Sequence, residues 1–80
     1  MGSAIVLLIA TTPEPAGAWR SALEQAGLTV LHAATGLDGM RDALAHEPDL
    51  VVLDFAAEDA ADVLRARGSL RRAGVALLVL

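Results

Sequence analysis

The chain alternates between short apolar runs and longer stretches in which apolar residues recur at helical spacing. The first, third and fourth runs are apolar at nearly every position, which is typical of strands that are buried on both faces of a sheet. The second run carries Thr29 and His32 among apolar residues, which favours an edge strand. We therefore predict strands over residues 4–10, 28–33, 48–54 and 75–80.

The stretches between the runs predict three helices. The first is expected from Thr12 to about Ala26, because proline follows at the first helical position and Gly27 supplies a left-handed stop. The second begins at a capping-box-like Thr35, and the third is expected over residues 57–67 and to end at Gly68. The residues expected to share the apolar face of the second helix are Leu37, Met40 and Leu44.

The resulting order, βαβαβαβ, predicts an α/β fold with an open parallel sheet and right-handed crossovers. The polar second strand belongs at an edge, so the expected strand order is 2-1-3-4. The fourth strand would then lie at the other edge although it is fully apolar. Exposed apolar edges tend to pair with other strands. We therefore expect either that the chain is incomplete at its C-terminus or that a second copy covers this edge.

Composition narrows the classes of function. Eighty residues form one domain, residues 1–80, whose small core makes stability marginal. The chain has no cysteine and a net charge of −4, which excludes disulfides and argues against direct nucleic-acid binding. No signal peptide or membrane span is visible, so a cytoplasmic protein is expected. The clustered arginines, read as a solvated helix end, are Arg65, Arg67, Arg71 and Arg72.

Asp54 is the leading candidate for chemistry. It follows an unbroken apolar run, at the carboxyl end of a predicted parallel strand, where open α/β sheets place their functional groups. A purely structural role, in which Asp54 caps the next helix or binds the loop through hydrogen bonds, is an equally good interpretation. His32 and His46 fall in different elements without an acid at ligand spacing, so they do not indicate a zinc site.

Three segments at matching intervals resemble the receiver domain of bacterial response regulators. They are Leu23-Glu24-Gln25-Ala26-Gly27-Leu28-Thr29-Val30, Ala33-Ala34-Thr35-Gly36 and Pro48-Asp49-Leu50-Val51-Val52-Leu53-Asp54. The resemblance implies a flavodoxin-like domain of two-component signalling, which accepts a phosphoryl group from a histidine kinase. Against the family's five strands, the fifth strand and the last helices are missing here. By position, Asp54 corresponds to the phosphoacceptor.

The chain departs from the family where Mg²⁺ would be held. The family's acid pair after the first strand corresponds to Ala10 and Thr11, neither of which supplies an anionic oxygen. Glu14, in the following turn, is an unfavourable substitute because its proline neighbours fix its direction. Asp54 and a backbone carbonyl near Ala56 would remain, which is a poor set for a cation that prefers carboxylates. We expect Mg²⁺ binding to be weak at most, with Asp54 as the candidate ligand.

Other parts of the family's site are also replaced. The hydroxyl after the fourth strand corresponds to Val79 or Leu80, and the chain contains no lysine. The loop after Asp54 is about two residues shorter than the family's. Its acids would repel a phosphoryl group, although they are equally explained as residues that complement a helix N-terminus; they are Glu58, Asp59 and Asp62.

The sequence therefore predicts a degenerate receiver-like domain, or pseudo-receiver, that signals through protein–protein contacts, is not an enzyme and is phosphorylated poorly or not at all. The alternative is a working receiver that a histidine kinase phosphorylates on Asp54. An unrelated enzyme has little support, because no nucleophile–base pair is visible. The expected partners are a histidine kinase or an output domain, together with a second copy that forms a dimer through the open edge strand.

Overall fold

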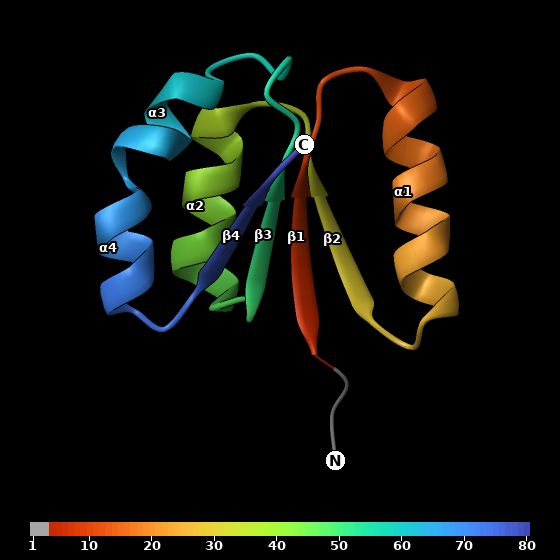
Figure 1. The fold of residues 1–80 in the computed structure, drawn as a ribbon, viewed down its shortest axis with the longest axis horizontal. Coiled ribbons are helices and arrows are strands. Elements are labelled where there is room, and N and C mark those ends of the chain that lie inside the picture. The colour runs from red at the N-terminus through yellow and green to blue at the C-terminus, as the bar shows by residue number, and fades with distance from the viewer. Residues whose placement is uncertain (1–3) are drawn as a thin grey trace.

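The computed structural model describes residues 4–80, which form a parallel sheet between two helical layers (Figure 1). The elements are β1 (Ile5–Ile9), α1 (Pro13–Gln25), β2 (Thr29–Ala33), α2 (Gly36–His46), β3 (Leu50–Leu53), α3 (Ala60–Arg65), α4 (Arg67–Arg72) and β4 (Ala76–Val79). The helix α1 covers one face of the sheet, whereas α2, α3 and α4 lie on the other (Figure 1).

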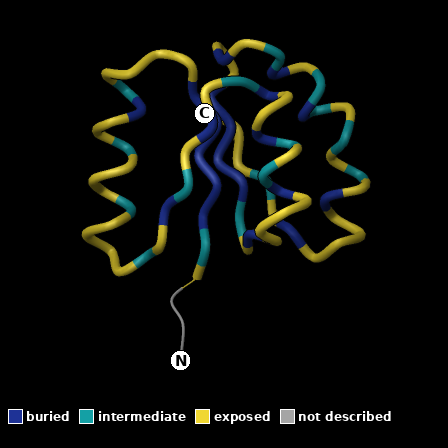
Figure 2. The backbone as a smooth tube through the Cα atoms, turned by 180° about the vertical axis from the view of Figure 1, so that it is seen from behind, coloured by how far each residue is buried: buried dark blue, intermediate teal, exposed yellow. Residues whose placement is uncertain are grey.

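The sheet has the predicted order β2-β1-β3-β4, and all of its strand pairs are parallel. The central strands β1 and β3 are buried along nearly their whole length (Figure 2). The edge strand β4 is largely exposed, although its composition is that of an interior strand. The predicted fold class and strand order are therefore confirmed.

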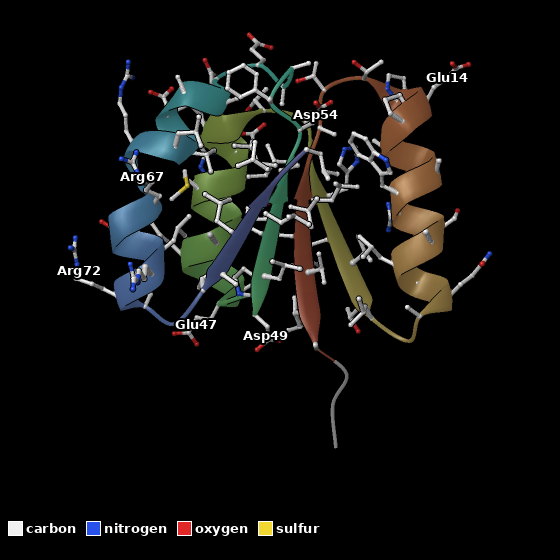
Figure 3. The ribbon with its side chains drawn as sticks, viewed as in Figure 1. Glu14, Glu47, Asp49, Asp54, Arg67 and Arg72 are labelled. Carbon is white, nitrogen blue, oxygen red and sulfur yellow. The ribbon has the colours of Figure 1, made fainter. Side chains whose placement is uncertain are left out.

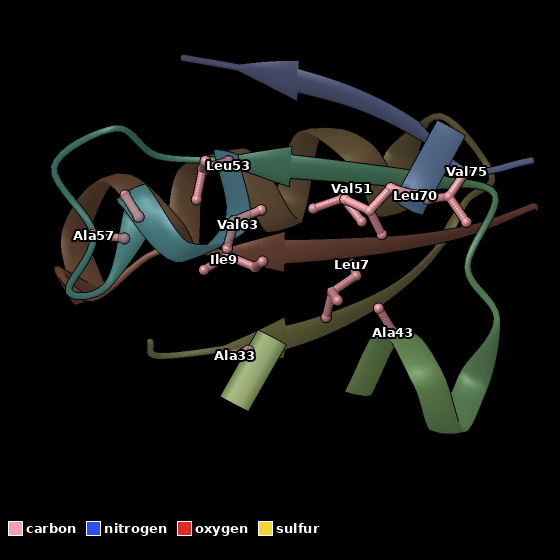
Figure 4. Packing of buried hydrophobic residues seen from close by; sticks show 11 residues of the cluster. Leu7, Ile9, Ala33, Ala43, Val51, Leu53, Ala57, Val63, Leu70 and Val75 are labelled. Atoms are coloured by element: carbon pink, nitrogen blue, oxygen red, sulfur yellow. The ribbon is translucent and has the colours of Figure 1, made fainter. Parts of the chain in front are cut away.

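The larger core cluster lies between the sheet and the three-helix layer (Figure 4). Leu7 and Ile9 of β1 and Val51 and Leu53 of β3 point into it and are fully buried. The smaller cluster lies between the sheet and α1, where Val6, Leu8 and Val52 meet Trp19 and Leu23. Successive residues of the two central strands therefore serve opposite cores, as their continuous apolar character requires.

The third predicted helix is in fact two short helices. It begins at Ala60 rather than at residue 57, because the backbone N–H and C=O of Glu58 bind partners outside the helix. The chain breaks at Ala66 and continues as α4, so Gly68 lies inside a helix and does not end one. Burial of Leu70 compensates for a glycine at this position. Gly74, with φ of 81°, makes the turn into β4.

The predicted apolar face of α2 is also wrong. Leu37 and Leu44 are exposed at 58% and 83%, and of the predicted trio only Met40 packs on the core. The buried residues of the helix are instead Gly36, Gly39 and Ala43. A Cβ on Gly39 would overlap the side chain of Ile9. Because α2 approaches β1 this closely, small residues rather than leucines occupy the interface.

The capping predictions are partly confirmed. The side-chain oxygen of Thr35 accepts a hydrogen bond from the Asp38 N–H at 3.1 Å, as the capping-box pattern predicts. Thr12 takes the N-cap position of α1, but its side chain makes no capping bond. Gly27, with φ of 88°, turns the chain out of α1.

Candidate functional site at the carboxyl ends of the strands

Asp54 lies directly after β3, where the loops that follow β1 and β3 meet (Figure 3). Its N–H donates to the Ile9 carbonyl at 2.9 Å, which extends the pairing of the two central strands by one residue. Its Oδ1 accepts a hydrogen bond from the Ala56 N–H at 3.0 Å. The residue is only 9% exposed. The structure thus shows the loop-binding role for this carboxylate, and that role uses one of its two oxygens.

Ala10 and Thr11 follow β1 directly, and Thr11 connects three loops. Its hydroxyl donates to the Ala34 carbonyl at 2.5 Å, in the loop between β2 and α2. The same oxygen accepts the Glu58 N–H at 2.8 Å, in the loop between β3 and α3. Thr11 therefore acts as a neutral hydrogen-bonding tie at a position where the resemblance implies a metal-binding acid.

The loop after Asp54 is held by a second backbone contact. The Gly36 N–H donates to the Glu58 carbonyl at 2.7 Å, and Thr35 and Glu58 form an isolated parallel bridge. A Cβ on Gly36 would overlap the Asp59 carbonyl, so only glycine permits this approach. The loop is thereby closed against the start of α2.

His32, on the edge strand β2, makes a defined contact. Its Nε2 lies 2.8 Å from the Ala10 carbonyl oxygen, in hydrogen-bonding geometry. This bond joins the residue after β1 to β2. Thr11, the next residue, joins the same segment to the loops that contain Ala34 and Glu58. No local sequence pattern indicates either hydrogen bond, because both bonds join residues more than twenty positions apart.

The acidic residues do not form a cation site. Glu14 is exposed in the first turn of α1, away from Asp54 (Figure 3). Asp62 pairs with Arg65 of its own helix at 2.9 Å. Within residues 4–80, no group of three or more His, Asp or Glu side chains is arranged to hold a metal ion. The donor set at this edge does not fit Mg²⁺, because Thr11 is neutral and its oxygen is already committed to two backbone groups.

The end of β4 completes the site with apolar residues. The Leu80 N–H donates to the Leu53 carbonyl at 2.8 Å, and the Leu80 carbonyl accepts the Phe55 N–H at 3.1 Å. The backbone of Leu80 is therefore hydrogen-bonded to the residues directly before and after Asp54. Val79 and Leu80 offer no hydroxyl that could bond to an oxyanion, and their side chains are 40% and 50% exposed.

Comparison with known proteins places this arrangement in a fold class. No protein-family model matches the sequence, and no curated protein matches it. Among solved structures, one described as "MaeR D54A mutant response regulator bound to sulfate" superposes with a TM-score of 0.80 at 21% identity. That match covers 99% of this chain and 67% of the other. A response regulator receiver protein from Pseudomonas putida gives a TM-score of 0.69 at 18% identity, and the match covers 99% of this chain and 69% of the other.

The chain therefore has the fold of a response regulator receiver domain, as the resemblance implied. In residues 4–80, no helix is long and apolar enough to cross a membrane.

Proposed function

We propose that the chain is a receiver-like signalling module that acts through protein contacts rather than catalysis, and that phosphorylation of Asp54 is absent or strongly impaired. The supporting observation is Thr11. A carboxylate that attacks a phosphoryl group needs a divalent cation and fixed donors to offset the developing negative charge. Here the threonine hydroxyl is committed to Ala34 and Glu58. Mg²⁺ binding is accordingly weak at best.

The second candidate is a working phosphoacceptor. It is favoured by the position of Asp54 at the end of a central strand, with one carboxylate oxygen bonded to the Ala56 N–H. A similar fold, that of MaeR, is described with bound sulfate, an oxyanion that resembles a phosphoryl group. In this case the missing charges would come from Glu14, the acidic loop or another chain, and phosphorylation would alter the surface around α3 and β4.

Intact-mass measurement after incubation with acetyl phosphate and Mg²⁺ separates the two candidates. We expect no phosphoryl adduct on the folded chain, as for Asp54→Asn. An adduct that requires both Asp54 and Mg²⁺, and that persists in the matched control Asp42→Asn, would establish the phosphoacceptor instead. Thr11→Asp sharpens the test, because it restores one acid of the missing pair. This variant should bind Mg²⁺ more tightly than the unaltered chain.

The open side of β4 supports the contact-based function. Among the described strands β4 pairs only with β3, and the exposed apolar residues in it and directly after it are Leu78, Val79 and Leu80. Such an edge readily accepts another strand. The occupant predicted from the sequence for this edge is a second copy, and the other expected partners are a histidine kinase or an output domain. Sedimentation velocity over a range of concentrations tests the second copy directly, because self-association would raise the weight-average mass as concentration increases.

A further inference from the structure

A groove runs between α4 and β4 on the three-helix side of the sheet. It has a volume of about 450 Å³ and is lined by Arg67, Gly68, Arg71, Val75, Ala76 and Leu77. Arg67 and Arg71 are thus the two charged residues of a lining that is otherwise apolar. The groove runs along β4, which is the last strand of the described sheet.

The arginines of α4 differ from the others in their partners. Arg20, Arg41 and Arg65 each form an ion pair with a carboxylate on their own helix. In the described part of the chain, the arginines of α4 form no ion pair. Arg67 donates to the Leu64 carbonyl, and Arg72 donates to the Ser69 hydroxyl.

The local sequence supplies no acid to pair with these cations. The segment 63–80 contains four arginines and no Asp or Glu, although the whole chain is acidic. The positive charge is therefore concentrated beside the groove, next to Leu77 and the β4 edge. Arg67 and Arg71 are available to an anionic partner.

The backbone of β4 presents unpaired groups to the same partner. The N–H groups of Ala76 and Leu80 bond to Asp49 and Leu53 on the β3 side. Because successive residues of a strand direct their backbone groups to opposite sides, Leu77 and Val79 direct theirs to the open edge.

The opposite face beside β4 is apolar. A hollow of about 160 Å³ lies between α1 and the two last strands, and it is lined by Trp19, Ala22, Leu23, Val52, Leu78 and Leu80. An added strand would therefore meet cations on one face and apolar side chains on the other.

We propose that the β4 edge binds an extended, acidic segment of a partner protein, which adds as a fifth strand with acidic and apolar residues in alternation. This proposal rests on the contact-based function above and specifies its partner. The rise between Arg67 and Arg71, four residues apart on a helix, is about 6 Å. Alternate residues of a strand are about 6.6 Å apart. Two acidic residues at alternate positions of the added strand therefore have about the same spacing as the two arginines. The apolar residues between them face the hollow that is lined by Trp19.

A second copy of the chain fits this edge less well. Antiparallel pairing of two β4 edges about a two-fold axis perpendicular to the sheet brings both α4 helices to the same face. The arginines of the two grooves would then confront one another, and like charges in such positions are destabilising. A nucleic acid would satisfy Arg67 and Arg71, but it has no backbone amides to pair with Leu77 and Val79.

The experiment uses the 80-residue chain and a labelled ten-residue peptide of alternating Glu and Val. We expect saturable binding by fluorescence anisotropy, a change in Trp19 emission, and slower hydrogen exchange at the Leu77 and Val79 amides. The double variant Arg67→Glu/Arg71→Glu should weaken binding at least tenfold. The matched control Arg72→Glu, on the same helix but outside the groove lining, should change it less than threefold.

Two altered peptides test the two halves of the proposal. Replacing Glu by Gln should weaken binding through loss of charge. Methylation of alternate peptide nitrogens should abolish the protection of Leu77 and Val79, because strand addition needs those hydrogen bonds. Binding without protection of these amides, or equal affinity for a single-stranded oligonucleotide, would overturn the proposal. So would protection of β4 that rises with protein concentration alone, since a second copy would then be the occupant.

These outcomes are independent of the phosphorylation test. An Asp54 adduct together with peptide binding would overturn only the impaired-phosphorylation part of the proposed function. Absence of both adduct and peptide binding would overturn the acidic-strand proposal and leave the contact-based function to other partners. Circular dichroism of the charge-reversal variants shows whether a loss of binding reflects unfolding. Both substituted arginines are exposed, so folding should be unaffected.

Discussion

The two faces of the sheet are covered to different extents. On one face, α2, α3 and α4 enclose a cluster that reaches from Ala33 at the end of β2 to Val75 directly before β4. On the other face, α1 covers β1 and β2 but leaves Leu78 of β4 and the following Leu80 half exposed. Both faces belong to the same four strands. The number of helices that pack on a face, rather than the hydrophobicity of its strands, therefore decides how much of it is buried.

Because of this difference, substitutions on the two faces should affect different properties of the chain, either its stability or its binding to a partner. The central residues of the three-helix face are already fully buried, so changing them alters folding. Residues around β4 retain exposed apolar and charged groups, so changing them should alter what the chain binds. The two effects can be distinguished by measuring the free energy of unfolding and partner binding on the same variants.

The largest expected effect is that of Ile9→Ala on the three-helix face. Ile9 is fully buried and lies against Gly39. Its truncation should cost about 3 kcal/mol of unfolding free energy, through lost burial and the cavity that remains. Urea denaturation measures this cost, and Ile9→Val should cost only about 1 kcal/mol. An equal loss for Leu78→Ala on the open face would contradict the contrast between the faces.

Gly39→Ala should destabilise the chain by about 1–2 kcal/mol, because the added methyl group overlaps the Ile9 side chain. This loss is expected even though alanine is the better helix former by about 1 kcal/mol. In the double variant Ile9→Ala/Gly39→Ala, the new methyl group enters the space left by the isoleucine. A double-mutant cycle should therefore show a combined loss smaller than the sum of the single losses. Simple additivity would mean that α2 does not contact β1 as closely as the structure shows.

Thr11→Val should cost about 0.5–1.5 kcal/mol, because it removes the hydrogen bonds to the Glu58 N–H and the Ala34 carbonyl, which are exposed and can bond to water instead. Exchange of the Glu58 amide should accelerate by more than exchange at the centre of β1. Thr11→Ser restores the hydroxyl and should recover most of the loss. Thr12→Val, at a neighbouring residue whose side chain makes no capping bond, is the matched control and should change little.

The strand pattern was sufficient to predict the sheet. Continuous apolar runs fixed β1 and β3 as central strands, and Thr29 and His32 correctly placed β2 at an edge. The face of α2 was not predictable from the same rule, because helical periodicity favours leucines over glycines. The structure instead buries Gly39 since α2 lies very close to Ile9. Periodicity reports the polarity of a helix face, but not the distance at which that face packs.

The candidate site shows a similar limit. The position of Asp54 after β3 followed from the chain order, and the substitution of Ala10 and Thr11 for acids followed from the spacing. The bonds from Thr11 to Ala34 and Glu58 join loops that are distant in sequence. They also explain why α3 starts three residues later than predicted, since the Glu58 backbone is engaged elsewhere. Such contacts depend on how loops meet in space, which no local pattern encodes.

The smallest expected effect on stability is that of Leu78→Lys on the open face. Leu78 is 49% exposed, so the change in unfolding free energy should stay within about 0.5 kcal/mol. Binding of the alternating Glu–Val peptide should nevertheless weaken severalfold, because a lysine in the hollow beside Trp19 meets the apolar residues of the added strand. Leu44→Lys on α2, at a leucine that is 83% exposed, is the matched control and should leave both quantities unchanged. If Leu78→Lys instead destabilised the chain as strongly as Ile9→Ala, the face beside β4 would belong to the core, and it would not be available to a partner.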